Sequence, residues 1–133
     1  MDYYSTCPIP KQSESNGKHP DRLSDKEFRL AVWANERGRD RATGQILYKS
    51  HPNAFRRGQV CHLKCRRVRP DWRNDPNRAV LLSDFHHQLS DHRGGNLLKL
   101  TDPDTGEPAI DARLPIRCTL YRRDGSVVWS HVR

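Results

Sequence analysis

The chain has 133 residues and a formal net charge of +8 at pH 7, with 34% hydrophobic and 30% charged residues, which suits one domain with its own core. It lacks a long apolar run, a secretory leader and a regular cysteine framework, which excludes a membrane-spanning or disulfide-rich secreted protein and predicts a soluble, cytoplasmic one. The excess positive charge favours a polyanionic partner, DNA or RNA first, because each neutralised phosphate releases condensed counterions.

The N-terminal part of the sequence predicts a flexible arm followed by a helix. Residues 1–22 are rich in Ser, Pro, Lys and Asn and have no apolar period, which is typical of a mobile arm. Ser24 is placed as a helix N-cap, with Glu27 three residues later to complete a capping box. The helix is expected to end at Gly38 and to pack into the core, with its basic residues facing solvent rather than forming a site.

A turn and a strand are predicted next. The Thr-Gly pair at 43–44 is a turn signal between two short segments that can form strands. Residues 59–65 then alternate as a strand does, which places His62 on one side and Cys61 on the other.

A basic segment surrounds and follows this strand. Residues 56–78 contain eight Arg and Lys residues and two Asp residues, so much of the excess charge lies in one part of the chain. A solvated loop explains this density poorly, whereas a surface that binds nucleic acid explains it well. The arginines expected to contact nucleic acid are Arg56, Arg57, Arg66, Arg67, Arg69 and Arg78.

A short apolar segment and a helix with histidines complete the central part. Residues 79–82 are so short and apolar that they predict a buried strand or the lead into a helix. Ser83 can cap the following helix, which is expected to stop at the glycine pair 94–95. His87 and Asp91 are i, i+4 neighbours on one face of this helix, so they can share an ion.

The remainder of the chain predicts antiparallel β structure. Residues 96–101 form one strand, and residues 116–121 and 126–132 form two paired strands. The fold class expected is α+β, with an N-terminal helix, a C-terminal antiparallel β-sheet and a single domain over residues 23–133.

The central stretch resembles the ββα-metal motif of HNH endonucleases. The likeness is carried by VCHLKCRR at 60–67 and LLSDFHHQLSD at 81–91, and RATGQIL at 41–47 is similar to the segment that commonly precedes the motif. The resemblance covers about residues 41–95. It implies a ββα core over residues 59–95 of a nuclease domain, and the strand pattern described above predicts C-terminal β-hairpins over residues 96–133.

The resemblance also implies a role for each residue that matches the motif. His62 corresponds to the general base, a role that suits a neutral imidazole. Asn77 corresponds to the middle asparagine, which orients the site. Cys61, His87 and Asp91 correspond to ligands of one divalent ion, Mg, Mn, Ni or Zn, that polarises the scissile phosphate. A thiolate beside an imidazole suits zinc or nickel better than magnesium, so the identity of the ion stays open.

The motif and the function each leave alternatives. Counting back from His87 places the middle asparagine on Arg78, whereas counting from His86 places it on Asn77. The function implied is a metal-dependent HNH-type endonuclease of prokaryotic or phage origin that hydrolyses DNA, with double-stranded DNA as the expected partner. The alternative is a non-catalytic nucleic-acid-binding module that uses the same ββα unit and basic loop. The sequence leaves the oligomeric state open.

Overall fold

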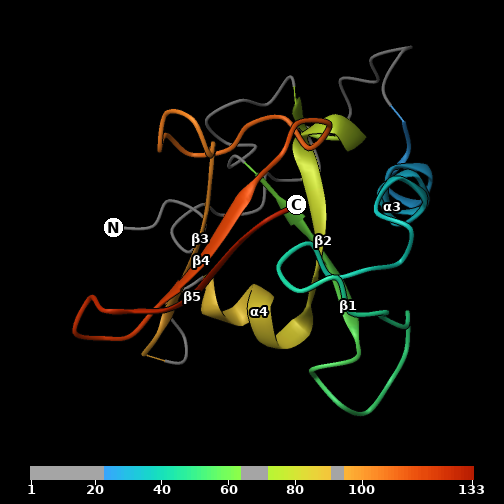
Figure 1. Cartoon of the computed structure of the whole chain (residues 1–133). Coiled ribbons are helices and arrows are strands. Elements are labelled where there is room, and N and C mark those ends of the chain that lie inside the picture. The colour runs from blue at the N-terminus through green and yellow to red at the C-terminus, as the bar shows by residue number, and fades with distance from the viewer. Residues whose placement is uncertain (1–22, 64–71, 91–94) are drawn as a thin grey trace, which may run out of the picture.

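The structure is a computed structural model, and it describes residues 23–63, 72–90 and 95–133 (Figure 1). It is an α+β fold with antiparallel sheets. The elements are α3 (Asp25–Asn35), β1 (Gly58–His62), the 3-10 helix η2 (Pro76–Arg78), β2 (Ala79–Ser83), α4 (Asp84–Leu89), β3 (Leu97–Thr101), β4 (Arg117–Tyr121) and β5 (Val127–Val132). Several predictions fall outside the described residues, namely the arm at 1–22, Arg66, Arg67, Arg69 and Asp91.

Helix α3 begins where the capping signal predicts. The Ser24 hydroxyl accepts a hydrogen bond from the Glu27 backbone N–H at 3.1 Å, and the Glu27 carboxylate accepts one from the Ser24 N–H at 3.0 Å. This reciprocal capping box satisfies two backbone donors at the start of the helix. At the other end, Arg37 and Gly38 have φ values of 56° and 65°, the left-handed conformation that terminates helices. The chain therefore leaves the helix close to Gly38, as expected.

The predicted hairpin around residues 43–44 is reduced to a tight turn. A single antiparallel bridge joins Arg39 to Ile46 in place of two strands. Asp40 explains the difference, because its side chain accepts the Ala42 N–H at 2.8 Å and its backbone N–H donates to the Gln45 carbonyl at 2.8 Å. These bonds satisfy the backbone of the turn locally.

Strands β1 and β2 form a two-stranded antiparallel sheet that leads directly into α4 (Figure 1). Gly58 lies opposite Ser83, and His62 lies opposite Ala79. The Ser83 hydroxyl accepts the backbone N–H of His86 at 3.1 Å and caps α4, so the predicted cap is confirmed. The described elements here follow in the order β1, η2, β2 and α4.

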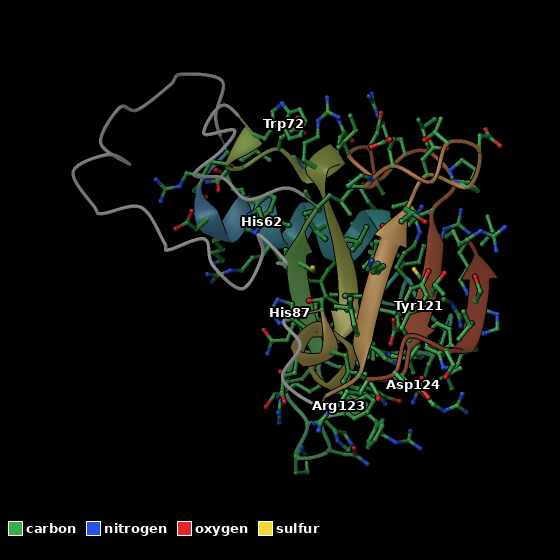
Figure 2. All side chains as sticks on the ribbon, turned by 90° about the vertical axis from the view of Figure 1, so that its left-hand side faces the viewer. His62, Trp72, His87, Tyr121, Arg123 and Asp124 are labelled. Carbon is green, nitrogen blue, oxygen red and sulfur yellow. The ribbon has the colours of Figure 1, made fainter. Side chains whose placement is uncertain are left out.

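The two faces of the β1–β2 sheet pack against different elements. Alternation along β1 turns Val60 towards α3 and Cys61 away from it. His62, labelled in Figure 2, lies on the α3 side. The cluster under α3 consists of Phe28, Val32 and Ala79, with Leu23 and Val60 packed on it. The larger cluster on the opposite face joins the sheet to α4 and to β3 and β4 through Cys61, Leu63, Val80, Leu82, Leu89, Leu98, Leu100, Cys118 and Leu120.

The C-terminal sheet has the strand order β3–β4–β5, and both pairs are antiparallel. Leu120 of β4 lies opposite Trp129 of β5, and both side chains belong to or pack on the larger cluster. The predicted C-terminal antiparallel sheet is therefore confirmed. No helix in the described part of the chain has the length and apolar character that a membrane crossing requires.

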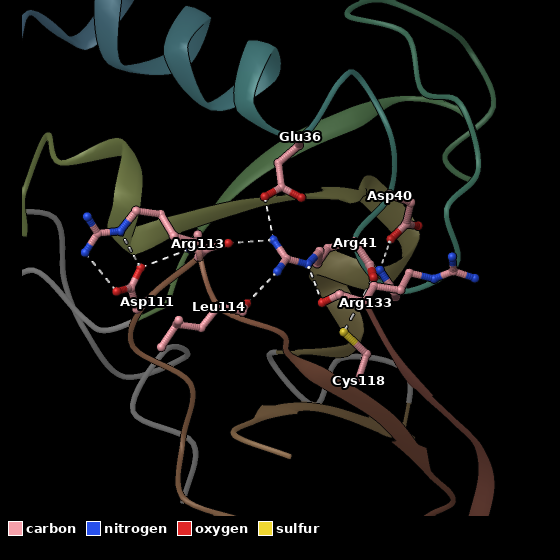
Figure 3. A network of polar contacts seen from close by, with 10 residues as sticks. Glu36, Asp40, Arg41, Asp111, Arg113, Leu114, Cys118 and Arg133 are labelled. Atoms are coloured by element: carbon pink, nitrogen blue, oxygen red, sulfur yellow. Dashed lines mark hydrogen bonds and ion pairs between the residues drawn. The ribbon is translucent and has the colours of Figure 1, made fainter. Parts of the chain in front are cut away.

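Arg41 joins the N-terminal half of the fold to its C-terminal end (Figure 3). Its guanidinium donates to the Glu36 carboxylate at 2.7 Å and to the carbonyls of Ala112, Leu114 and Arg133 at 3.0, 2.8 and 3.2 Å. The Arg41 side chain is only 12% exposed, so water competes little for these bonds. Burial raises the pKa of the Glu36 carboxyl, and the charge of Arg41 opposes that increase.

We expect Arg41→Met to lower the free energy of unfolding at neutral pH by about 3 kcal/mol, because it leaves a buried carboxylate and three carbonyls without their donor. Since the pKa of Glu36 is raised in the folded state, its contribution to stability is fully present below the unfolded pKa of about 4.5 and is lost as pH rises through the folded pKa. Removing Arg41 raises that pKa further, so the loss of stability with rising pH becomes larger. Urea unfolding of both proteins across this pH range measures the effect.

The control is Arg113→Met, because the Arg113 side chain is 63% exposed and pairs with Asp111 at the surface. Its unfolding midpoint should match that of the wild type. If Arg41→Met and Arg113→Met unfold at the same urea concentration, the role assigned to Arg41 is wrong.

Candidate active site

His62 is held in one orientation at the end of β1. Its ring stacks on Phe28, with the centroids 5.2 Å apart and the planes inclined by 19°. Its Nε2 lies 3.3 Å from the backbone carbonyl oxygen of Arg73. In the tautomer that donates this bond, Nδ1 is the basic nitrogen of the ring. A carbonyl that fixes the tautomer and a ring that supports the imidazole are the means by which proteins orient a functional histidine.

His62 lines a groove between α3 and β1 with a volume of about 720 Å³. Four of the described lining residues are cationic, whereas the Asp25 carboxylate accepts a hydrogen bond from the Asn74 side chain at 3.0 Å. Such a groove attracts anions to the edge of the His62 ring. The lining residues that carry this argument are Lys26, Arg29, Trp33, Lys49, His62 and Arg73.

Cys61 points to the opposite face of the same strand. It is 4% exposed and packs in the larger apolar cluster with Leu63 and Leu89. Its Sγ donates to the carbonyl oxygen of His62 at 3.7 Å. A charged thiolate and a hydrated ion are both costly in such apolar surroundings, so this setting does not fit a metal ligand.

The neighbouring histidines of α4 occupy different environments. His86 is 8% exposed, and its Nδ1 lies 2.6 Å from Asp40 Oδ2 and 3.0 Å from the Ser83 hydroxyl, so it tethers α4 to the turn at residue 40. His87 is partly exposed and lies apart from His62 in Figure 2. It does not line the His62 groove. Because His86 is engaged in a structural contact, His87 is the α4 imidazole with access to solvent.

Asn77 lies in η2 and is not among the residues that line the His62 groove. Its backbone N–H donates to the Asp75 side chain at 2.9 Å, and its carbonyl accepts the Ala112 N–H at 2.7 Å. It lines a second hollow of about 520 Å³ together with Ala112 and Arg113. Asn77 and His62 therefore line different hollows.

Two of the predicted nucleic-acid-binding arginines are occupied within the fold. Arg57 pairs with the Asp84 carboxylate and donates to the His51 carbonyl at 2.8 Å. Arg78 lies over the Trp72 ring, 4.2 Å from its centroid, and donates to the Ile110 carbonyl at 2.7 Å. Arg56 is exposed at the surface.

The metal expected from the resemblance fits the described residues in part. The partly exposed imidazole of His87 is a suitable ligand, whereas the buried thiol of Cys61 is not. Within the described ranges of the chain, no three His, Cys, Asp or Glu side chains gather closely enough to hold an ion. Asp91 lies outside those ranges.

The basic face of α3 was not expected to belong to a site. Lys26, Arg29 and Trp33 recur at the spacing of one helical face, next to the apolar stripe of Phe28 and Val32. The sequence signal is therefore an aromatic residue in line with two cations. This signal indicates a site only when the fold is known, because it is β1 beside this face of α3 that forms the groove.

No protein-family model, no curated protein and no solved structure matches the chain. The assignment of a function rests on the residues described above.

Proposed function

We propose that the chain is a metal-dependent endonuclease of the HNH type, which hydrolyses phosphodiester bonds of DNA with His62 as general base. The observation that carries the proposal is the setting of His62. It ends the first strand of a β–β–α unit, it is oriented by Phe28 and by the Arg73 carbonyl, and it opens onto a cationic groove. A positioned imidazole is the commonest general base for activating water at neutral pH.

The chemistry assigned to the chain's own groups is proton transfer and charge stabilisation. With its Nε2 bonded to the Arg73 carbonyl, the His62 ring accepts on Nδ1 the proton of the water whose oxygen attacks phosphorus. The P–O bond to the leaving sugar oxygen breaks, and that oxygen takes up a proton from solvent. Lys26 and Arg29, which line the same groove, stabilise negative charge that develops on the phosphate. A divalent ion would add Lewis-acid stabilisation of the phosphate, and the ligand for it that α4 offers is the partly exposed imidazole of His87, which does not line the groove.

The second candidate function is nucleic-acid binding without hydrolysis. The burial of Cys61 favours it, because a binding module needs the cationic groove but not a metal ligand on β1. The same ββα unit then serves as a scaffold for the groove.

A plasmid-nicking assay separates the two candidates. The nuclease proposal expects conversion of supercoiled DNA to the nicked form with at least one of Mg, Mn, Ni and Zn, and none with excess chelator. Retardation of the plasmid in a gel with no nicking in any of these ions would support the binding module instead.

A further inference from the structure

We infer that the groove between α3 and β1 is a binding track for a single strand of nucleic acid, with Trp33 stacking on a base and Lys26 and Arg29 contacting the phosphates. Placing one phosphodiester of that strand at His62 rests on the proposed function. The binding itself requires no hydrolysis, and it is a property of residues that the sequence motif does not include.

The charges of the groove are arranged along its length. Lys26 and Arg29 are exposed on successive turns of α3, and Lys49 lies near the other end, with Nζ 5.9 Å from the centroid of the Trp33 ring. The Asp25 carboxylate, which also lines the groove, is bonded to the Asn74 amide. A row of exposed cations facing a concave surface matches the repeating charge of a phosphodiester backbone.

Trp33 supplies an aromatic wall at the end of the groove away from His62. The ring rests against the backbone of β1 at Gly58, where a Cβ atom would lie 2.5 Å from Cη2 of the ring. The ring is partly exposed and lines the groove. An aromatic ring beside cations in a groove is how proteins stack the bases of a single strand without reading sequence.

The size of the groove favours one strand over a duplex. Its volume of about 720 Å³ lies within the range of about 300–1,000 Å³ that is usual for sites holding small ligands. The groove runs along strand β1, which spans about 13 Å from Gly58 to His62 at about 3.3 Å per residue. This length is close to the width of the major groove of DNA, which is only one part of a duplex. A base can stack on Trp33 in this space only when it is unpaired.

The test is the affinity of the full chain for a short labelled oligothymidylate, measured by fluorescence anisotropy in the presence of chelator so that no cleavage occurs. The double variant Lys26→Ala/Arg29→Ala should bind about tenfold more weakly. The negative slope of the logarithm of the association constant against the logarithm of the salt concentration should become less steep by about 1.4. The matched control is Lys99→Ala/Arg123→Ala, which removes two exposed cations from the C-terminal sheet and its turn and should bind like the wild type.

Variants at the aromatic wall test the stacking contact separately. Trp33→Leu should weaken binding about tenfold without changing the salt slope, because stacking releases no counterions. Gly58→Ala should have a similar effect, since the added methyl displaces the Trp33 ring. Circular dichroism of each variant checks that the fold is retained.

Equal losses of affinity in the groove variant and its control would overturn the inference, and so would tighter binding of a duplex of the same sequence. Displacement of the oligonucleotide by polyglutamate through the same two cations would also overturn it, because it would identify an acidic-peptide site. The outcome is separable from that of the nuclease proposal. Groove-dependent binding without plasmid nicking retains the track and rejects the enzyme. Nicking that depends on His62 but not on the groove cations rejects the track alone.

Discussion

His62→Ala is expected to lower the single-turnover rate of DNA cleavage by about a hundredfold to ten-thousandfold, the usual contribution of a general base. The imidazole is the group at the end of β1 that can accept a proton from water, and Phe28 and the Arg73 carbonyl hold it in place for that task. Oligonucleotide affinity should stay close to that of the wild type, because Lys26 and Arg29 remain in the groove. The rate is measured with enzyme in excess over a labelled DNA.

Two further variants show whether the loss comes from the lost base. In His62→Gln, the side-chain amide can replace the imidazole as the donor to the Arg73 carbonyl, but it cannot accept the proton of water. This variant should therefore be as inactive as His62→Ala. His131→Ala removes an exposed imidazole that stacks on Trp129 of β5, and it should cleave at the wild-type rate. Full activity of His62→Gln would mean that position 62 serves the geometry of the site and not proton transfer.

Asp40→Ala is expected to cost about 3–5 kcal/mol of the free energy of unfolding, the largest effect on stability that we predict. Asp40 is 1% exposed, and its carboxylate accepts the backbone N–H groups of Ala42 at 2.8 Å and Ser83 at 3.4 Å. Its Oδ2 also lies 2.6 Å from Nδ1 of His86. The substitution leaves these buried polar groups without their acceptor and releases α4 from the turn.

Urea denaturation followed by tryptophan fluorescence measures this loss. Asp104→Ala is the matched control, because Asp104 is an exposed carboxylate in the turn between β3 and β4, and its midpoint should equal that of the wild type. Asp40→Asn should be intermediate, since the amide oxygen still accepts one backbone bond. Coincident midpoints for the two alanine variants would contradict the structural role of the Asp40–His86 pair.

The local parts of the fold could be predicted because their signals are local. The capping box of Ser24 and Glu27 and the cap at Ser83 each depend on residues three positions apart, which sets hydrogen-bond geometry directly. The alternation that separates His62 from Cys61 follows from the period of a strand. The α+β class with antiparallel sheets follows from the order of these elements.

The groove could not be predicted, because it is formed by segments far apart in the chain. Alternation predicts that His62 and Cys61 lie on different faces of the sheet. It does not predict which of these faces packs against α3 and which packs against α4. The position of Asn77 depends in the same way on how η2 packs against the segment at Ala112. Counting residues within a motif cannot supply that long-range information.

The most direct measurement of the central claim is cleavage of a labelled DNA strand by the wild-type protein in water enriched in heavy oxygen, followed by mass spectrometry of the product ends. Hydrolysis by a water molecule that His62 deprotonates predicts one heavy oxygen atom in the terminal phosphate formed at each cut and none in the hydroxyl end of the other product, with almost no product formed by His62→Ala. Intact DNA in every divalent ion tried, or products that carry no label, would contradict the account.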